Sequence, residues 1–228
     1  MDGLLSQLAA SDKRVLERLS EHGKAWIVGG WVRDSLQGLN PEEMDIATNL
    51  HPDVVMQLFD KTIPVGAAFG TILVLDEDSE KSWEVTTLRS EGTYGDGRRP
   101  DKVEFGDDII EDLARRDFTI NAMAMDINPS RFGDLTDPFG GIADIEKKVL
   151  RTPLDPDETF SEDPLRMMRA AYFASKLGFT IEQECRTSMK KQSHRIEIVS
   201  IERIRDEFIK ILKTDKPSIG PVILQKTG

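Results

Sequence analysis

The alternation of hydrophobic and polar positions divides the chain into a mixed first part and a helical second part. Up to about residue 127, short apolar runs typical of strands alternate with segments of helical periodicity. The pattern predicts strands at 25–28, 44–47, 69–75, 83–88 and 122–127, and helices at 3–22, 31–37, 51–59 and 108–116. Residues 89–102 are rich in Gly, Arg and Asp, and we expect them to form a mobile loop.

The strongest break in this pattern is the run of Pro and Gly residues from Asp137 to Gly141. Beyond it, the pattern predicts a short strand at 149–152 and helices at 161–177, 182–193, 201–213 and 218–226. We therefore predict two domains, a mixed α and β domain of residues 1–140 and a helical domain of residues 141–228.

The composition is that of a globular protein, with 39% hydrophobic and 31% charged residues. No apolar run approaches the roughly 20 residues that span a bilayer, and the first residues do not resemble a secretion signal. Cys185 is the only cysteine, so no internal disulfide can form. These features predict a cytoplasmic protein without membrane association. The histidines His22, His51 and His194 are too scattered to predict a zinc site.

The distribution of charge leaves the question of a nucleic-acid partner open. A net charge of −11 argues at first against one, because phosphates attract Lys and Arg. Residues 164–216, however, contain 12 Lys and Arg against 7 Asp and Glu, so this segment carries +5 and the rest carries −16. Charge alone neither predicts nor excludes RNA binding.

Two features near the start suggest phosphate and metal chemistry. A strand that ends in Gly29-Gly30 and leads into a helix lets backbone N–H groups approach a phosphate closely. Glu43 and Asp45 should project from the same face of a strand, where two carboxylates repel each other unless a cation such as Mg²⁺ lies between them. Taken separately, an ordinary strand–turn–helix connection and two exposed edge acids explain these features at least as well.

Together, the stretches VGGWVRDSLQG and EMDIAT resemble the signature of the nucleotidyltransferase superfamily that includes the class II tRNA nucleotidyltransferases (CCA-adding enzymes) and bacterial poly(A) polymerases. The resemblance implies an α+β, polymerase-β-like head with a mixed β-sheet and flanking helices, followed by an all-helical neck. It also implies that Glu43 and Asp45 hold Mg²⁺ and that Gly29, Gly30 and Arg33 bind the nucleotide. The family usually has Asp-x-Asp at the acidic pair, so Glu43 departs from its pattern by one methylene group.

The resemblance continues in order along the chain. Glu84 resembles a third carboxylate near the metal pair, and its alternative is the polar residue of an alternating strand. Arg116, Asp117 and Asn121, in the stretch RRDFTIN, resemble the motif that contacts the ribose and phosphates of the NTP. The alternative for the arginine pair in this stretch is a solvated helix end.

The stretch EDPLRMMR resembles the motif whose Asp and Arg act as a protein template, which implies nucleotide binding by Asp163, Arg166 and Arg169. Asp163 and Arg166 are three residues apart, so we expect them on one helix face, where they could hydrogen-bond the Watson–Crick edge of a base. The alternative is a surface ion pair. The family often has a further Arg where this chain has Tyr172. Residues 200–207 resemble the last neck motif, whose charged residues we expect to brace the template helix through ion pairs.

The function implied is template-independent addition of C and A to the 3′ end of tRNA from CTP and ATP. The Gly-Thr form of residues 65–71 resembles the CCA-adding branch, and the loop at 92–102, which CC-adding specialists tend to lack, is present. We therefore expect complete CCA addition, with A-only addition and poly(A) polymerase activity as alternatives. Alternatives of another class are a catalytically weakened nucleotide- or RNA-binding module and a nucleotidyltransferase for a small molecule. Relatives continue into helical body and tail domains, so we expect either a fragment or a naturally short protein.

Overall fold

The computed structural model describes residues 8–41, 43–66, 70–89 and 105–228, which form two compact units. The first unit contains the described residues up to 89, together with 105–114 and 121–139. The second contains 115–120 and 140–228. Residues 115–120 therefore belong to the second unit, although both of their flanking segments belong to the first.

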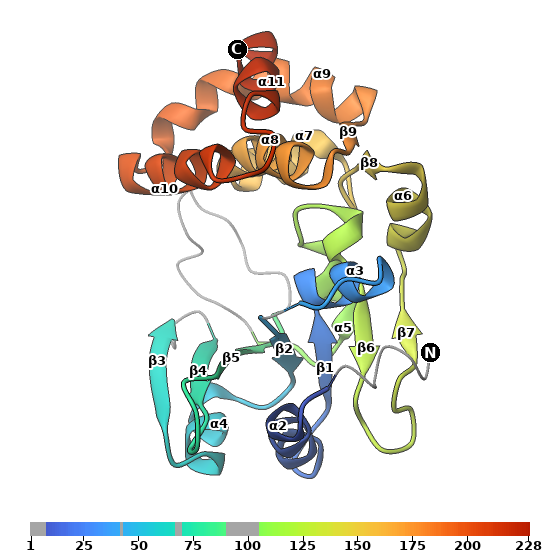
Figure 1. Cartoon of the computed structure of the whole chain (residues 1–228), viewed down its shortest axis with the longest axis vertical. Coiled ribbons are helices and arrows are strands. Elements are labelled where there is room, and N and C mark those ends of the chain that lie inside the picture. The colour runs from blue at the N-terminus through green and yellow to red at the C-terminus, as the bar shows by residue number, and fades with distance from the viewer. Residues whose placement is uncertain (1–7, 42, 67–69, 90–104) are drawn as a thin grey trace. The chain divides into compact units, whose positions relative to one another are not determined.

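The first unit is built on a mixed sheet with the strand order β3-β4-β5-β2-β1-β6-β7, seven strands within the described residues. The strands β2 and β5 pair in parallel, and the other neighbours pair antiparallel. The strands are β1 Ala25–Val28, β2 Asp45–Thr48, β3 Thr62–Gly66, β4 Thr71–Leu75, β5 Ser82–Thr87, β6 Ala124–Asp126 and β7 Leu135–Thr136. The helices are α2 Ala10–Ser20, α3 Gly30–Leu36, α4 Pro52–Leu58 and α5 Ile109–Ala114 (Figure 1).

Helices bury the central strands of this sheet. Every residue of β1 is buried, and its Trp26 and Val28 pack with Leu113 of α5 in one hydrophobic cluster. The helices α2 and α4 contact each other, and they contact β1 and β4–β5 respectively. A strand that is buried on both faces is a continuous apolar run, which is why the sequence pattern predicts β1 correctly.

The second unit is organised around α8, which contacts α7, α10, α11 and the short strands β8 and β9 (Figure 1). Met167, Ala170 and Phe173 of α8 lie in its main core, and Phe118, from the segment 115–120, packs edge-on against Phe173. The elements are α6 Gly141–Lys147, β8 Val149–Leu150, α7 Pro156–Glu162, α8 Leu165–Leu177, β9 Thr180–Ile181, α9 Gln183–Gln192, η3 Ser193–Ile198, α10 Ile201–Leu212 and α11 Ile219–Thr227; a further 3₁₀ turn, η2, spans Thr119–Asn121.

The α+β architecture with a mixed sheet and flanking helices is confirmed, and most expected elements lie within a few residues of their predicted places. The single helix expected at 161–177 is wrong, because α7 ends at Glu162 and α8 begins at Leu165. Asp163 between them has extended backbone (φ −140°, ψ 98°), as the residue before Pro164 is expected to have.

The elements that the pattern did not predict are short. They are β3, η2, β7, α6, most of α7, β9 and η3, and β9 pairs with β8 in the otherwise helical second unit. Residues 3–7 of the expected first helix and 90–102 of the expected loop lie outside the described residues. Within the described ranges, no helix is both long and apolar enough to cross a bilayer.

Candidate active site

The turn between β1 and α3 places its two glycines beside the start of β2. Gly29 adopts φ 69° and ψ −133°, a backbone conformation that is open to glycine and strongly disfavoured for other residues. Val28, the last residue of β1, pairs directly with Asp45, the first residue of β2. The predicted phosphate-binding turn and the predicted acidic pair therefore lie at the same end of neighbouring strands.

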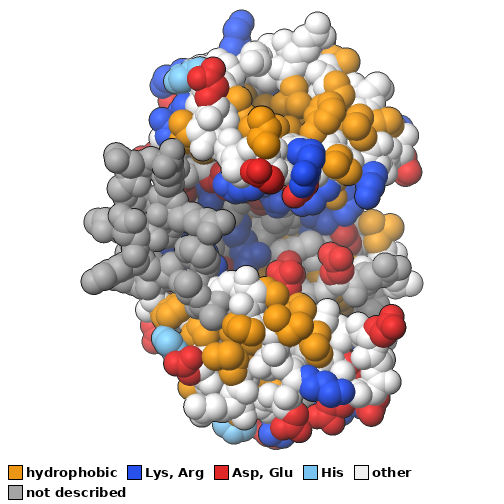
Figure 2. Space-filling model, turned by 90° about the vertical axis from the view of Figure 1, so that its left-hand side faces the viewer, with side chains coloured by type: hydrophobic (Ala, Val, Ile, Leu, Met, Phe, Trp, Pro, Cys, Tyr) orange, Lys and Arg blue, Asp and Glu red, His pale blue; other side chains and the backbone are white. Residues whose placement is uncertain are grey.

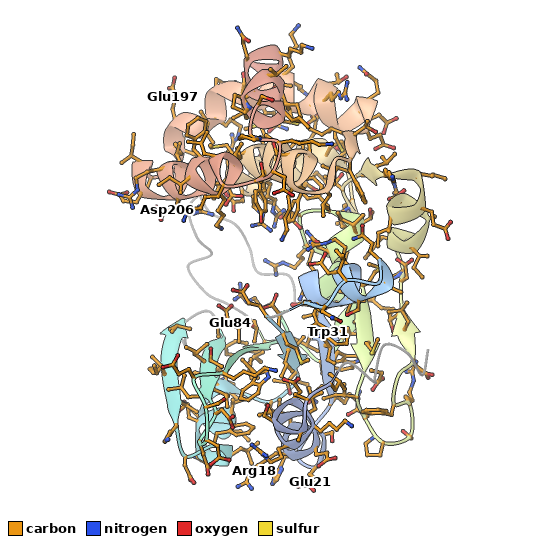
Figure 3. All side chains as sticks on the ribbon, viewed as in Figure 1. Arg18, Glu21, Trp31, Glu84, Glu197 and Asp206 are labelled. Carbon is orange, nitrogen blue, oxygen red and sulfur yellow. The ribbon has the colours of Figure 1, made fainter. Side chains whose placement is uncertain are left out.

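The three predicted carboxylates come together at this end of the sheet. Asp45 is in register with Glu84 across the parallel β2–β5 pair, and both residues are exposed at the surface. Glu84 is labelled on the sheet in Figure 3. Glu43 is exposed and Met44 is buried, so the alternation that the sequence predicts for this pair is present although β2 begins only at Asp45. Partial burial, and then the negative charges of Asp45 and Glu43, raise the pKa of Glu84 above its usual value.

The carboxylates fit a cation that is shared with a substrate. No group of three or more His, Cys, Asp or Glu side chains within the described residues could by itself hold a metal ion. Mg²⁺ is usually bound by one or two carboxylates together with waters and substrate phosphates, not by a closed protein cage. The part of the Glu84 pKa rise that comes from Asp45 and Glu43, which is smaller than the part from burial, is the repulsion that a divalent cation would neutralise.

Two of the predicted nucleotide-binding residues meet in the first unit. Arg33 of α3 is buried, and its Nη1 donates a hydrogen bond to Oδ1 of Asn121 at 2.6 Å. Its Nε and Nη2 donate to the two carboxylate oxygens of Asp34, each at 2.7 Å. This bidentate pair fixes the plane of the guanidinium group. Sequence reasoning missed Asp34, although its position next to Arg33 was a usable signal.

Asp117, Arg166 and Arg169 meet in the second unit. Nε and Nη2 of Arg169 both contact Oδ2 of the buried Asp117, at 2.7 Å and 2.6 Å. Burial lowers the pKa of Arg169, but the Asp117 carboxylate and more distant acids outweigh this effect and raise the pKa overall. Arg166 donates from Nη2 to the carbonyl oxygen of Arg115 at 2.7 Å. The segment 115–120 is thus tied to α8 at two points, with Arg116 partly buried between them.

Asp163 does not share a helix face with Arg166, contrary to our expectation. It lies in the extended junction between α7 and α8, where its Oδ1 accepts a hydrogen bond from the Leu165 N–H at 3.1 Å. Its Oδ2 accepts one from Nη2 of Arg203 on α10 at 2.8 Å. Arg166 instead pairs with Glu162, at 3.1 Å. Residues 200–207 were expected to brace the template helix through ion pairs, and Arg203 does form one, but with Asp163, which precedes α8.

Local backbone conformation and packing explain the glycine in the Gly-Thr pair at 70–71. Gly70 adopts φ 88°, and a Cβ atom there would lie 2.9 Å from Cε1 of Phe105. Residues with side chains are therefore excluded by both backbone conformation and space. Residues 67–69 of the same stretch, and the predicted loop at 92–102, lie outside the described residues.

A match to a family model identifies the protein family of this chain. The family model described as "Poly A polymerase head domain" matches residues 25–151, more than half of the chain. The chain belongs to this family. A second family model, "Probable RNA and SrmB-binding site of polymerase A", matches residues 178–228. The head-domain match covers all of the strands that carry the acidic cluster.

Curated relatives of this head-domain protein are named CCA-adding enzymes. The one from Ligilactobacillus salivarius is 45% identical over 207 residues, which are 90% of this chain and 50% of the relative. The one from Bacillus pumilus is 48% identical over 200 residues, 87% of this chain and 48% of the relative. The chain therefore spans about half the length of the curated relatives that it matches.

Solved structures give the same result for the fold. The Bacillus stearothermophilus CCA-adding enzyme in complex with CTP matches with a TM-score of 0.85 and 36% identity, over 96% of this chain and 52% of that chain. The Thermotoga maritima CCA-adding enzyme complexed with tRNA matches with a TM-score of 0.82 and 26% identity, over 99% of this chain and 53% of that chain. Their agreement confirms the nucleotidyltransferase head and neck.

Proposed function

We propose that this chain carries the nucleotide-adding part of a cytoplasmic tRNA nucleotidyltransferase that adds C and A to the 3′ end of tRNA from CTP and ATP. The observation that carries the proposal is the register of β2 with β5 and β1, because it gathers Asp45, Glu84 and the Gly29 turn at one end of the sheet. Kinship with CCA-adding enzymes, among them one solved with CTP and one with tRNA, supports the choice of substrates.

The reaction is an in-line displacement at the α-phosphorus of the NTP. The oxygen of the RNA 3′-OH forms the new bond, the bond to the β,γ-pyrophosphate breaks, and the proton of the hydroxyl is released. Glu43 and Asp45 would hold two Mg²⁺ here, one of which would activate the hydroxyl while the other would hold the triphosphate. Glu84 adds a third negative charge beside Asp45 and so strengthens the attraction for a cation.

The first unit supplies the phosphate contacts in this proposal. The Gly29-Gly30 turn offers backbone N–H groups at the start of α3, and the two glycines carry no side chains of their own. Arg33 is held by Asp34 and Asn121, so it supports the turn as a fixed positive charge one helical turn further on. We assign residues 1–140 to the catalytic head and residues 141–228 to the neck that selects the nucleotide.

The second unit supplies base selection. Asp163 has an acceptor carboxylate that is about one third exposed, and Arg166 has guanidinium donors beyond those used by Thr159, Glu162 and Arg115. An acceptor and a donor array can match the Watson–Crick edges of cytosine and adenine without a nucleic-acid template. The Asp117–Arg169 pair would hold the segment with Arg116, which we assign to the ribose and phosphates.

The surface charge of the second unit suits an RNA partner. Residues 164–216 carry a net charge of +5, and Lys and Arg side chains are plentiful on the face of this unit drawn in Figure 2. Such contacts neutralise phosphates without reading sequence. The match of residues 178–228 to a family model named for RNA binding supports this assignment.

The test is incubation of the 228-residue chain with tRNA lacking its terminal CCA, with Mg²⁺ and labelled CTP, ATP or both. We expect one or two C residues with CTP alone, and a terminal A when both nucleotides are present. Addition of A alone would favour the A-adding alternative, and long A tracts would favour a poly(A) polymerase. Nucleotide binding without any transfer would point to the catalytically weakened module.

A further inference from the structure

Arginines from two other elements hold the C-terminal end of α7. Arg166 of α8 donates from Nη1 to the carbonyl oxygen of Thr159 at 3.2 Å, and Arg195 of η3 donates from Nη2 to the carbonyl oxygen of Ser161 at 3.0 Å. Carbonyl groups in the last turn of a helix carry partial negative charge, so charged donors suit them, and the Thr159 carbonyl oxygen accepts the Asp163 N–H as well. Asp163 follows α7 directly, and these bonds therefore fix the segment from which its carboxylate projects.

The segment that carries Arg195 also holds the other end of α7. Nζ of Lys191 contacts Oδ2 of Asp157 at 2.6 Å, and Nε2 of Gln192 donates to the carbonyl oxygen of the same residue at 3.0 Å. Because α9 and η3 are continuous in the chain, they brace α7 at its first and last turns. The segment lies within residues 178–228, the part matched by the RNA-binding family model.

The Arg195 side chain includes a buried hydrogen-bond donor without a partner. Its Nε is buried and has no hydrogen-bond partner within the described residues, whereas its Nη2 holds Ser161. A buried donor without a partner lowers the stability of the fold, and such local violations are expected where function constrains a residue. An apolar side chain of similar length would avoid this penalty but could not hold the Ser161 carbonyl group.

We propose that Arg195 is a positioning residue for base selection, which acts through Ser161 on the orientation of Asp163. The proposal rests on the proposed function, in which Asp163 reads the base. Arg195 fixes the backbone before Asp163, the Leu165 N–H holds Oδ1, and Arg203 holds Oδ2. A carboxylate restrained in these three ways presents its free lone pairs in one fixed direction. Discrimination between bases requires such a fixed orientation.

The test compares three variants. Arg195→Met removes the donors and keeps an apolar stem, Arg195→Lys keeps a charged donor, and Arg186→Met removes the same charge from an exposed position on α9. The readouts are kcat/KM for CTP and for UTP, and the thermal unfolding temperature. For Arg195→Met we expect the CTP preference to fall about tenfold, as for loss of one charged hydrogen bond. Its unfolding temperature should stay within about 2 °C of the parent's, because the unsatisfied donor is removed with the bond.

The other two variants serve as controls for Arg195→Met. Arg195→Lys should recover most of the preference, and Arg186→Met should match the parent. An unchanged preference in Arg195→Met would overturn the proposal, and so would an equal loss in Arg186→Met. A large drop in unfolding temperature with equally weakened use of every nucleotide would assign Arg195 a structural role and would also overturn it.

Failure of the proposed function would look different, because the parent itself would then add no nucleotide. In that case amide hydrogen exchange tests the positioning directly. The Leu165 amide, which donates to Asp163, should exchange about tenfold faster in Arg195→Met than in the parent, with α9 amides unchanged. Equal protection in both proteins would contradict the link between Arg195 and Asp163.

Discussion

Asp45 and Glu84 are direct neighbours across the parallel pair of β2 and β5, although the chain forms α4, β3 and β4 between them. This register sets two carboxylates side by side at the end of the sheet where β1 turns into α3. The acidic cluster is therefore a product of sheet topology, and the burial of Glu84 together with repulsion from its acidic neighbours is the physical basis of the first prediction.

In the absence of divalent cations, Glu84→Gln should stabilise the protein at pH 8. Burial and the charges of Asp45 and Glu43 raise the pKa of Glu84 in the folded state. The ionised group therefore opposes folding above that pKa, and this effect disappears below the unfolded value of about 4.3. The gain should grow as pH rises through the raised pKa, and urea titrations at pH 4 and pH 8 measure it.

The matched control for this prediction is Glu80→Gln, which removes the same charge from the exposed turn between β4 and β5 and should change stability at neither pH. Added Mg²⁺ should shrink the gain of Glu84→Gln, because the cation neutralises the same repulsion. A gain of equal size at both pH values would contradict the electrostatic explanation.

Asp163→Ala should blur discrimination among the four NTPs more than it weakens triphosphate binding. The carboxylate would accept from an exocyclic amine that UTP and GTP do not present in the same place. Competition of each NTP against labelled CTP measures both effects, with Asp206→Ala on the exposed face of α10 as the control. Equal loss of affinity for all four nucleotides, with selectivity unchanged, would count against the template role.

Arg169→Met should lower the free energy of unfolding by about 2 kcal/mol, because it removes both charged donors that Arg169 supplies to the buried Asp117 carboxylate. Urea denaturation measures the loss. The exposed Arg186→Met should change stability by less than about 0.5 kcal/mol. If the two variants lost the same small amount, the Asp117–Arg169 pair would not hold the segment 115–120 against α8.

RNA binding by this chain should be weak and sensitive to salt. The net charge of +5 over residues 164–216 allows only a few phosphate contacts, and contacts of this kind give dissociation constants of about 1 μM or weaker at physiological salt. Filter binding of tRNA from 50 to 300 mM salt should show a steep, linear loss on a double-logarithmic plot. Tight binding that persists at high salt would show that residues 1–228 grip tRNA by themselves.

Local pattern predicts the elements that are buried on both faces or strongly periodic, such as β1 and α10. It does not predict β3, whose exposed Ile63 and Val65 and central Pro64 lack the alternation of a half-buried strand. It also joins the last two residues of α7 to α8, although Pro164 marks the junction between the two helices, and it misses the rest of α7.

The residues of the candidate site also fall into those that local sequence predicts and those that it does not. The Gly29-Gly30 turn and the alternation at Glu43 and Asp45 are local, and the sequence predicts both. The place of Glu84 beside them came from family resemblance, because no spacing rule relates strands that pair across a crossover. Arg195 has no sequence signal, since its contact with Ser161 exists only once η3 has folded against α7.

The most direct test of the account is the rate of Mg²⁺-dependent CTP and ATP incorporation into tRNA lacking CCA, measured for the parent, Asp45→Ala and Asp53→Ala. Asp45 is exposed at the start of β2, so its loss should leave the fold intact and lower the rate by at least about 10³-fold. Asp53→Ala, on the exposed face of α4, should match the parent. An Asp45→Ala variant that adds nucleotides at the parental rate would contradict the assignment of the acidic cluster as the catalytic centre.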